Sequence, residues 1–213
     1  ITATGVETIT GSLTDVGDVV DVDTNKGTAG QQIDIDTDYN VTLSDTGNMS
    51  ASALNTLNGK VPGTLTVTNA VTLTGTASDI ATAASADSAG TLALAANFGA
   101  TVSAGAVDAA DLTTIYGQTS ATINATAATG INGSAANVHT VIDHAQVNHD
   151  TNFTVTISGT SAAAADLKAI DAITSGTINA STVTLITGNA SDANDIYDST
   201  QIVGIGNEAV NLS

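Results

Sequence analysis

Short runs of alternating apolar and polar residues recur along this chain, and Ala-rich segments with regularly spaced apolar residues follow them. Alternation over residues 153–158 predicts a strand, because successive side chains of a strand point to opposite faces. Over 162–173 apolar residues recur at every third position, which predicts a helix with one apolar stripe. Ser161 is the expected N-cap of this helix, and Gly176 is expected to end it.

A second pass of the same kind follows directly. Short strands are expected at 177–180 and 183–186, where β-branched residues are frequent. A short helix is expected near 192–197, with Asn189 or Ser191 as its N-cap. The alternation of 208–212 then predicts the strand that opens a further unit.

A glycine-led phrase recurs four times, each time with its glycine at the same distance after an apolar residue. Its form is Gly, a small polar residue, two variable residues, Asp or Asn, and an apolar residue. The glycines are Gly11, Gly75, Gly133 and Gly188, and the acidic or amide positions are Asp15, Asp79, Asn137 and Asp192. We expect these Asp and Asn residues to lie in the first turns of helices, where such side chains interact well with the free amides.

The apolar residues of the longer helices keep a common register. The matching pairs are Leu54 and Leu57, Leu112 and Ile115, and Leu167 and Ile170, so the same pair returns at a nearly fixed interval. A fixed period indicates an array in which each unit buries its apolar face against its neighbours. The predicted fold is an α/β solenoid of stacked short strands and short helices, with about two coils per ~55-residue repeat. An all-β solenoid in which the Ala-rich segments are loops is the alternative.

The period also predicts the domain organisation. A half repeat with an acidic insertion is expected at 1–39, three repeats at 40–98, 99–152 and 153–208, and the opening strand of a next repeat at 209–213. Because the first and last residues both fall inside a repeat, we expect either an excerpt of a longer array or a subunit whose end units dock on another copy, head to tail.

Composition narrows the range of partners. The formal net charge is −18, and the only basic residues besides His are three lysines. Nucleic acid is therefore not an expected partner, since its phosphates need Lys and Arg to displace their counterions. No stretch approaches the roughly 18 consecutive apolar residues that suggest a membrane span, so no membrane insertion is expected. Aromatic residues make up 2 % of the chain, which argues against a large aromatic-walled pocket.

The most acidic stretch lies between the first two glycine-led phrases. Asp21, Asp23 and Asn25 occupy alternate positions, as in the opening of a calcium loop whose oxygens at positions one, three and five converge on the ion. Lys26 stands where an EF-hand has its glycine, and Gln32 stands where it has its bidentate Glu. The stretch therefore resembles only part of such a loop.

Three further acids alternate shortly afterwards. Asp34, Asp36 and Asp38 would lie on one face of a strand, about 7 Å apart in succession. Such a row repels itself unless it is solvated or bridged by a hard cation. The candidate metal ligands, with calcium as the ion, are thus Asp21, Asp23, Asn25, Asp34, Asp36 and Asp38. A merely solvated acidic face is the alternative.

Other candidate chemistry is weaker. His139, His144 and His149 are spaced by five, so the three cannot share one face of a helix, and on a strand only the outer two would. Surface histidines are the expected interpretation. The chain has no Cys, no nucleophile elbow and no phosphate loop, and catalytic activity is therefore not expected.

Three segments resemble the units of very long bacterial cell-surface repeat proteins, of the kind found in marine cyanobacteria and in large secreted adhesins. They are residues 158–171, 176–184 and 202–213, and the likeness extends over about 40–213. The resemblance implies an extracellular or cell-surface location and a structural or adhesive role. It supplies no catalytic residues.

The expected function is that of a structural repeat protein, a subunit or segment of a surface filament, sheath or giant adhesin that acts by stacking and head-to-tail assembly. Its expected partners are copies of itself or neighbouring repeats, with glycans as further candidates. The alternative is a binding module, such as a viral tail fibre or a carbohydrate- or ice-binding solenoid. Thr-x-Thr patterns, for example at Thr64, Thr66 and Thr68, keep the ice-binding form open.

Overall fold

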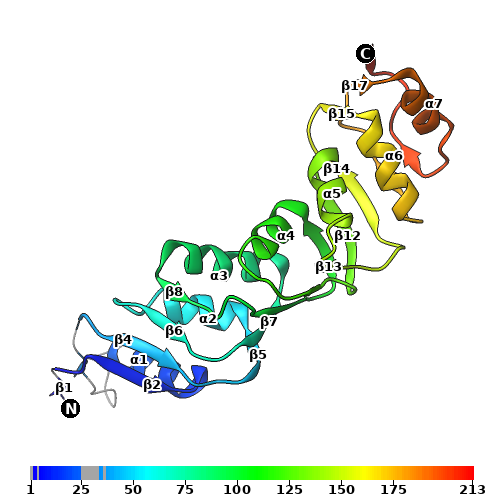
Figure 1. Ribbon diagram of the computed structural model, residues 1–213. Coiled ribbons are helices and arrows are strands. Elements are labelled where there is room, and N and C mark those ends of the chain that lie inside the picture. Colours follow the sequence, from blue (N-terminus) through cyan, green and yellow to red (C-terminus); the bar gives the residue numbers. More distant parts are fainter. Residues whose placement is uncertain (1, 4, 25–33, 36) are drawn as a thin grey trace. The chain divides into compact units, whose positions relative to one another are not determined.

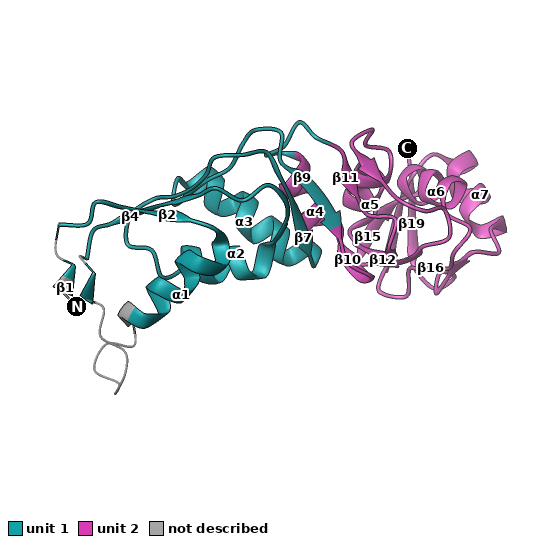
Figure 2. Ribbon diagram, turned by 90° about the horizontal axis from the view of Figure 1, so that it is seen from below, with its two compact units in different colours: residues 1–101, 117–121 teal, residues 102–116, 122–213 magenta. Residues whose placement is uncertain are grey.

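The computed structural model describes residues 2–3, 5–24, 34–35 and 37–213. Parallel strands alternate with short helices along the chain, so the fold is α/β (Figure 1). The chain divides into two compact units (Figure 2). The first comprises residues 1–101 and 117–121, and the second comprises 102–116 and 122–213.

Within the described residues, the first unit contains three helices and the short strands around them. Its elements are β1 (Thr2–Ala3), β2 (Thr8–Gly11), α1 (Leu13–Thr24), β3 (Asp34–Ile35), β4 (Asn40–Leu43), β5 (Gly47–Ser50), α2 (Ala51–Asn58), β6 (Leu65–Val67), β7 (Val71–Gly75), α3 (Ala77–Ala89), β8 (Leu92–Ala93) and β9 (Gly99–Val102), whose last residue belongs to the second unit. Strands β2, β4, β6 and β8 form one parallel sheet, β5 pairs with β7, and β1 pairs with β3.

The second unit contains four helices. Its elements are β10 (Gly105–Asp108), α4 (Ala109–Tyr116), β11 (Ile123–Asn124), β12 (Ala128–Gly133), α5 (Ala135–Ile142), β13 (Val147–Asn148), β14 (Thr154–Ile157), β15 (Ser161–Ala163), α6 (Ala164–Ile173), β16 (Ile178–Asn179), β17 (Leu185–Gly188), α7 (Ala190–Asp198), β18 (Ile202–Val203) and β19 (Ala209–Leu212). Strands β10, β12, β14, β16 and β18 form one parallel sheet, β15, β17 and β19 form another, and β11 pairs with β13.

Paired strands lie a nearly constant distance apart in the sequence. Ile178 pairs with Ile202, and Leu185 pairs with Ala209, so the two pairs have the same sequence separation although they belong to different sheets. A parallel pair needs a long crossover connection, and here that connection usually contains a helix. Consecutive helices pack against one another in each unit, α1 to α3 in the first and α4 to α7 in the second.

The core is a narrow layer between the strands and the helices. The three apolar pairs that the sequence placed on helices lie on α2, α4 and α6 and are all buried, which confirms this part of the prediction, although α1 and α3 are longer helices. Phe98 and Phe153, which occupy equivalent positions of successive repeats, are also fully buried. Because the helices and their buried stripes are present, the all-β alternative is wrong.

The glycine-led phrase forms the same strand-to-helix turn four times. Strands β2, β7, β12 and β17 end at the four glycines, and α1, α3, α5 and α7 begin at the second position after them. The residue after each glycine accepts the N–H of the Asp or Asn three positions on; the donor and acceptor pairs are Asp15 with Ser12 (3.1 Å), Asp79 with Thr76 (3.0 Å), Asn137 with Ser134 (3.2 Å) and Asp192 with Asn189 (2.9 Å). The expected place of these Asp and Asn residues in the first turns of helices is confirmed.

The turn explains one of these glycines in particular. Gly133 has φ 154°, and a Cβ at this position would lie 3.2 Å from the Cβ of Ala109 on α4. A side chain here would meet both an unfavourable backbone conformation and a packed neighbour. Glycine is thus required because the end of β12 lies close to the first residue of α4.

The helix predicted at 162–173 begins later than expected. Residues Ser161–Ala163 form β15, in which Ser161 pairs with Leu185 of β17, so their backbone is extended. Ala163 is the N-cap and makes no side-chain cap hydrogen bond, so the prediction of Ser161 as the cap is wrong. The helix also ends at Ile173, before Gly176, because Thr174 is extended and its hydroxyl donates to the carbonyl of Phe153.

The second pass agrees better with expectation. Helix α7 has Asn189 as its N-cap, one of the two predicted caps. The strand expected at 208–212 is present as β19, and those expected at 177–180 and 183–186 are present as β16 and β17 with shifted bounds.

Candidate functional site

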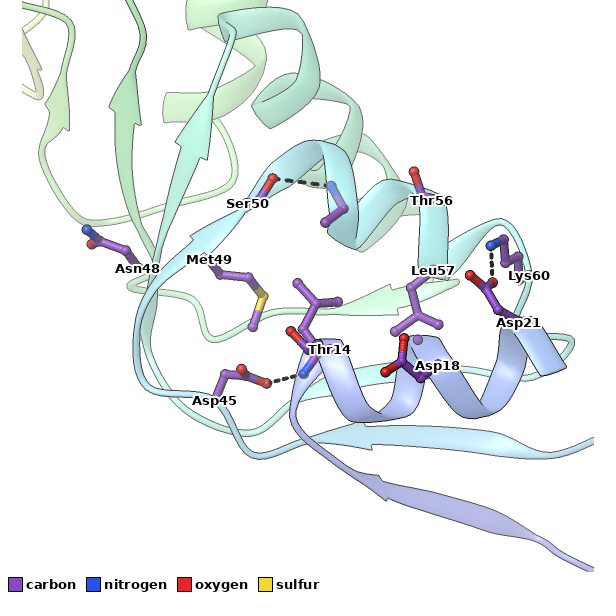
Figure 3. A pocket seen from close by; sticks show the side chains of 13 residues that line it. Thr14, Asp18, Asp21, Asp45, Asn48, Met49, Ser50, Thr56, Leu57 and Lys60 are labelled. Carbon is purple, nitrogen blue, oxygen red and sulfur yellow. Dashed lines mark hydrogen bonds and ion pairs between the residues drawn. The ribbon is translucent and has the colours of Figure 1, made fainter.

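A groove of about 590 Å³ lies between α1 and α2 in the first unit (Figure 3). Leu13, Gly17 and Asp21 recur at helical spacing on the face of α1 that borders it, while Val16 and Val20 are buried elsewhere on the same helix. The opposite wall comes from Met49, Ala53, Leu57 and Lys60 on and around α2.

The groove is wide because small residues stand where its walls face each other. By the register of the repeats, Gly17 is equivalent to His139 of α5, and Ala53 is equivalent to Asp166 of α6. In the second unit that His and Asp meet, with 2.8 Å between Nδ1 and Oδ1. In the first unit no side chain projects from Gly17, and a Cβ added there would have nothing within 4 Å.

Charged groups edge the groove, while Met49 and Leu57 make the wall on the α2 side apolar. Lys60 Nζ pairs with Asp21 Oδ1, joining the segment after α2 to α1. Their side chains are 32 % and 51 % exposed, so the pair contributes about 0–1 kcal/mol to stability. Asp45 Oδ2 accepts the backbone N–H of Leu13 at 2.7 Å and thereby holds the start of α1. The arrangement offers apolar contact and carboxylate oxygens to an occupant.

The sequence interpretation did not identify this groove. The Lys60–Asp21 pair joins positions 39 residues apart, a spacing that the period does not predict. The sequence signal that could have revealed the groove is that Gly17 and Ala53 stand at the repeat positions that His139 and Asp166 occupy in the second unit.

The structure distributes the predicted calcium ligands over several elements. Asp21 and Asp23 lie within α1, so the loop backbone expected there is helical. Asp34 opens β3 and Asp38 lies in the bend that follows it, both exposed, while Asn25 and Asp36 lie outside the described residues. Among the residues that the structure describes, no group of three or more His, Cys, Asp or Glu side chains could hold a metal ion. Calcium binding stays a prediction.

The three histidines hold separate contacts in the second unit. His139 reaches Asp166, and the His144 ring stacks on Tyr116 with 3.9 Å between centroids. His149 places Nε2 3.0 Å from the carbonyl oxygen of Ile142. These contacts connect neighbouring segments and do not converge.

Large apolar side chains gather on the surface where the second unit ends. Tyr197, Val210 and Leu212 are exposed there, and we call these three residues the end surface. The hydroxyl of Tyr197 donates to Glu208 Oε1. Burial, followed by this bond and the charge of Glu208, raises the pKa of Tyr197 to about 12.

Within the described part of the chain, no helix combines the length and the apolar character needed to cross a membrane. Comparisons with protein-family models, with curated proteins and with solved structures give no match to this chain.

Proposed function

We propose that this protein is a structural segment of a surface filament, sheath or giant adhesin, in which short strands and helices stack as the coils of an α/β solenoid. Its work is mechanical and non-enzymatic: to supply length and a stiff, regular surface. The repeats continue one another head to tail, and each buries its neighbour's apolar face. The resemblance to cell-surface repeat proteins supports an extracellular location.

One observation carries this proposal. Threonine hydroxyls in both units donate to backbone carbonyls 25 residues earlier, and two of them, Thr68 and Thr182, do so from matching repeat positions. The pairs are Thr68 with Leu43 (2.9 Å), Thr74 with Met49 (3.3 Å), Thr154 with Thr129 (3.2 Å) and Thr182 with Ile157 (2.9 Å). Regular side chain to backbone bonds of this kind hold successive layers at a fixed register.

A second set of bonds repeats with the longer period. The buried hydroxyls of Thr119 and Thr174 donate to the carbonyls of Phe98 and Phe153, respectively. Neighbouring Ser175 donates to the carbonyl of Thr151 at 3.1 Å. A buried hydroxyl that satisfies a backbone acceptor stabilises the native state, because an unpaired buried acceptor costs about 1–3 kcal/mol.

The binding alternatives receive less support. Tyr39, Phe98 and Phe153 are buried, which leaves few rings for stacking on sugars. The threonine row Thr10, Thr42 and Thr66 meets Ala93 at the next strand, so the flat threonine face that ice binding needs is short.

The proposal predicts how length grows with added repeats. Residues 99–153 make one period, and duplicating them after Phe153 recreates the native Phe–Gly junction of Phe98 and Gly99. Each duplication adds two layers, so the maximum dimension measured by solution scattering should increase by about 10 Å each time.

A matched control uses residues 99–139 as the insert, which breaks the register. This control should lose the regular increment and the cooperative unfolding transition. A series whose in-register members grow as compact globules, without a constant increment, would overturn the proposed stacking.

A further inference from the structure

The groove between α1 and α2 has the size of a small-molecule site. Its volume of about 590 Å³ lies within the range of roughly 300–1,000 Å³ that is usual for ligand pockets. Leu13 and Asp21 both line it, so it runs alongside about two turns of α1. Between them, a Cβ added to Gly17 would have no neighbouring atom within 4 Å among the described residues. The groove is therefore open along its middle.

Carboxylates lie at both ends of the groove (Figure 3). At one end, Asp45 accepts the N–H of Leu13 and, as a carboxylate, can accept further hydrogen bonds. At the other end, Asp21 pairs with Lys60. Asp18, three residues before Asp21, is exposed and has no ion-pair partner among the described residues. The lining of three carboxylates and one ammonium group thus has a formal net charge of −2.

The middle of the groove is apolar on the α2 side. Met49 and Leu57 line that wall, and Ala53 lies between them in the sequence. Hydroxyl groups of Thr14 and Thr56 also line the groove. An aliphatic chain can lie against the apolar wall, whereas an anion would meet the carboxylates at both ends.

The second unit supplies its own nitrogen base at the equivalent place. There His139 Nδ1 lies 2.8 Å from Asp166 Oδ1, between α5 and α6. The first unit has Gly17 and Ala53 at these positions, and its acids stand on α1 and before α2 instead. A cationic nitrogen bound in the groove would therefore restore the contact between a base and a carboxylate that the second unit makes with its own side chains.

The charge of the whole chain favours a cation as well. A formal net charge of −18 raises the local concentration of cations and repels phosphates and other anions. A single ammonium group at one exposed carboxylate is held weakly, because water and salt screen the pair. Selective binding needs a ligand that contacts the carboxylates at both ends and the apolar wall at the same time.

We propose that the groove binds a linear aliphatic diamine or polyamine. One ammonium group lies at Asp45, the other lies at Asp18, and the methylene chain between them packs against Met49 and Leu57. This inference goes beyond the proposed structural function and holds whether or not the repeats stack.

The spacing of the two carboxylates sets the length of the ligand. Asp18 is five residues after Leu13 on α1, and Asp45 lies 2.7 Å beyond the Leu13 nitrogen. The carboxylates are thus separated by about 10 Å along the helix, which a chain of roughly six to eight methylene groups spans. Asp21 contributes less to the site, because Lys60 already neutralises it.

A single methyl group reports on the groove. Met49 is the only methionine of the chain, so a ¹³C-methyl methionine label gives one NMR signal, and that signal comes from the α2 side of the groove. Titrating the intact chain with 1,8-diaminooctane in about 0.1 M salt should shift the signal to saturation. A signal that does not move, or that drifts without saturating, would overturn the proposal.

Two ligands with one ammonium group test the need for both ends. Octylamine should bind about two- to fivefold more weakly than the diamine, because it lacks the second ion pair. N-acetyl-lysine methylamide, which presents the side chain of a protein lysine, should give no saturating shift. If this lysine compound binds as tightly as the diamine, the groove accepts a basic side chain of a protein partner and the proposal fails.

Two substitutions of Gly17 test the place of binding. Gly17→Gln extends a neutral side chain into the groove and should abolish the saturating shift of Met49. Gly17→Ala is the matched control, because it also removes a glycine from α1 but adds only a methyl group, and it should keep the affinity within about twofold. Far-UV circular dichroism establishes that both variants are folded. Equal affinity of the two variants would overturn the proposal.

Two substitutions of aspartates separate the site from the overall charge. Asp18→Asn should weaken diamine binding about two- to fivefold. Asp198→Asn changes the net charge equally but lies on α7 of the second unit, and it should leave the affinity unchanged. Equal weakening by both would assign the binding to net charge alone and would overturn the proposal.

Discussion

Helices α5 and α6 of the second unit pack against each other, and so do α1 and α2 of the first; we call each of these helix–helix contacts a joint. The two joints use the same repeat positions but have different side chains between the helices. At the first of these, His139 meets Asp166 and a fully buried Leu167 lies beneath. At the other, Gly17 and Ala53 occupy the equivalent places and border a groove of about 590 Å³.

The strand register differs in the same way. Thr154 pairs with Gly130, at the separation that is regular for the repeat, whereas Asn40 pairs with Thr8 across a longer stretch of chain. The regular strand separation occurs at the α5–α6 joint, which His139 and Asp166 bridge, and the longer separation occurs at the α1–α2 joint, which contains the groove. The comparison teaches that a repeat can keep its strands and caps while the side chains between its helices decide whether a joint is closed.

The largest expected difference between the joints concerns their leucines. Leu167→Ala should lower the free energy of unfolding by about 2–5 kcal/mol, because it opens a cavity in a fully packed layer. Leu13→Ala at the groove should cost about 1 kcal/mol or less, since that side chain is only half-buried. Urea unfolding followed by circular dichroism measures both. Equal losses would mean that Leu13 at the groove is packed as tightly as Leu167.

Loss of a buried hydroxyl should have the next largest effect on the free energy of unfolding. Thr174→Val leaves the carbonyl of Phe153 and the N–H of Gly176 without their partner, at a cost of about 1–3 kcal/mol. Thr154→Val is the control, because its exposed hydroxyl can be replaced by water, and should change stability by about 0.5 kcal/mol or less. If the Thr174 variant is as stable as its control, the Thr174 hydroxyl does not contribute to stability as expected.

Glycine substitutions should act with opposite signs in the two regions. Gly133→Ala introduces a Cβ against Ala109 at a φ of 154° and should destabilise by about 1–3 kcal/mol. Gly17→Ala has open space around it in the middle of α1 and should stabilise by about 0.5–1 kcal/mol. Thermal unfolding of the two variants measures whether each substitution raises or lowers stability. A change in the same direction for both would contradict the difference in packing around Gly133 and Gly17.

The His–Asp contact found between α5 and α6 can also be introduced between α1 and α2. Gly17→His combined with Ala53→Asp places the His139 and Asp166 pair at the groove. A double-mutant cycle should show a favourable coupling of about 0.5–1 kcal/mol below pH 6, where the imidazole is charged. Zero coupling would indicate that the two helices lie too far apart for the bridge.

The smallest effect is expected at the end surface. Because the pKa of Tyr197 is raised in the folded protein to about 12 from its ordinary value of 10.0, its contribution to stability is present below pH 10 and is lost as the pH rises through 12. Ultraviolet titration should show a late ionisation step that belongs to Tyr197. Glu208→Gln should bring that step back toward pH 10, and an unchanged late step would assign the shift to burial alone.

Much of the fold follows from local pattern. The four glycine-led turns could be predicted because each one needs a glycine, an N-cap acceptor and an Asp or Asn within five positions. The buried stripe of Leu112 and Ile115 was likewise visible as a spacing. These features depend on residues close in sequence, and local chemistry is enough to specify them.

The rest depends on contacts between distant residues. Residues 161–163 look like a helix start, yet pairing with β17 makes them a strand. The groove is bordered by small residues, Gly17 and Ala53, where the second unit has His139 and Asp166, and the period alone does not show that this exchange opens a groove.

The most direct test of the stacking account is a pair of deletions followed by thermal unfolding. Removing residues 99–153 deletes one full period and joins Phe98 to Thr154, whereas removing 99–139 deletes fewer residues but breaks the register. The account predicts that the longer deletion retains a cooperative transition and native-like circular dichroism per residue, and that the shorter one loses both. Equal behaviour of the two proteins would contradict a fold held together by one repeated joint.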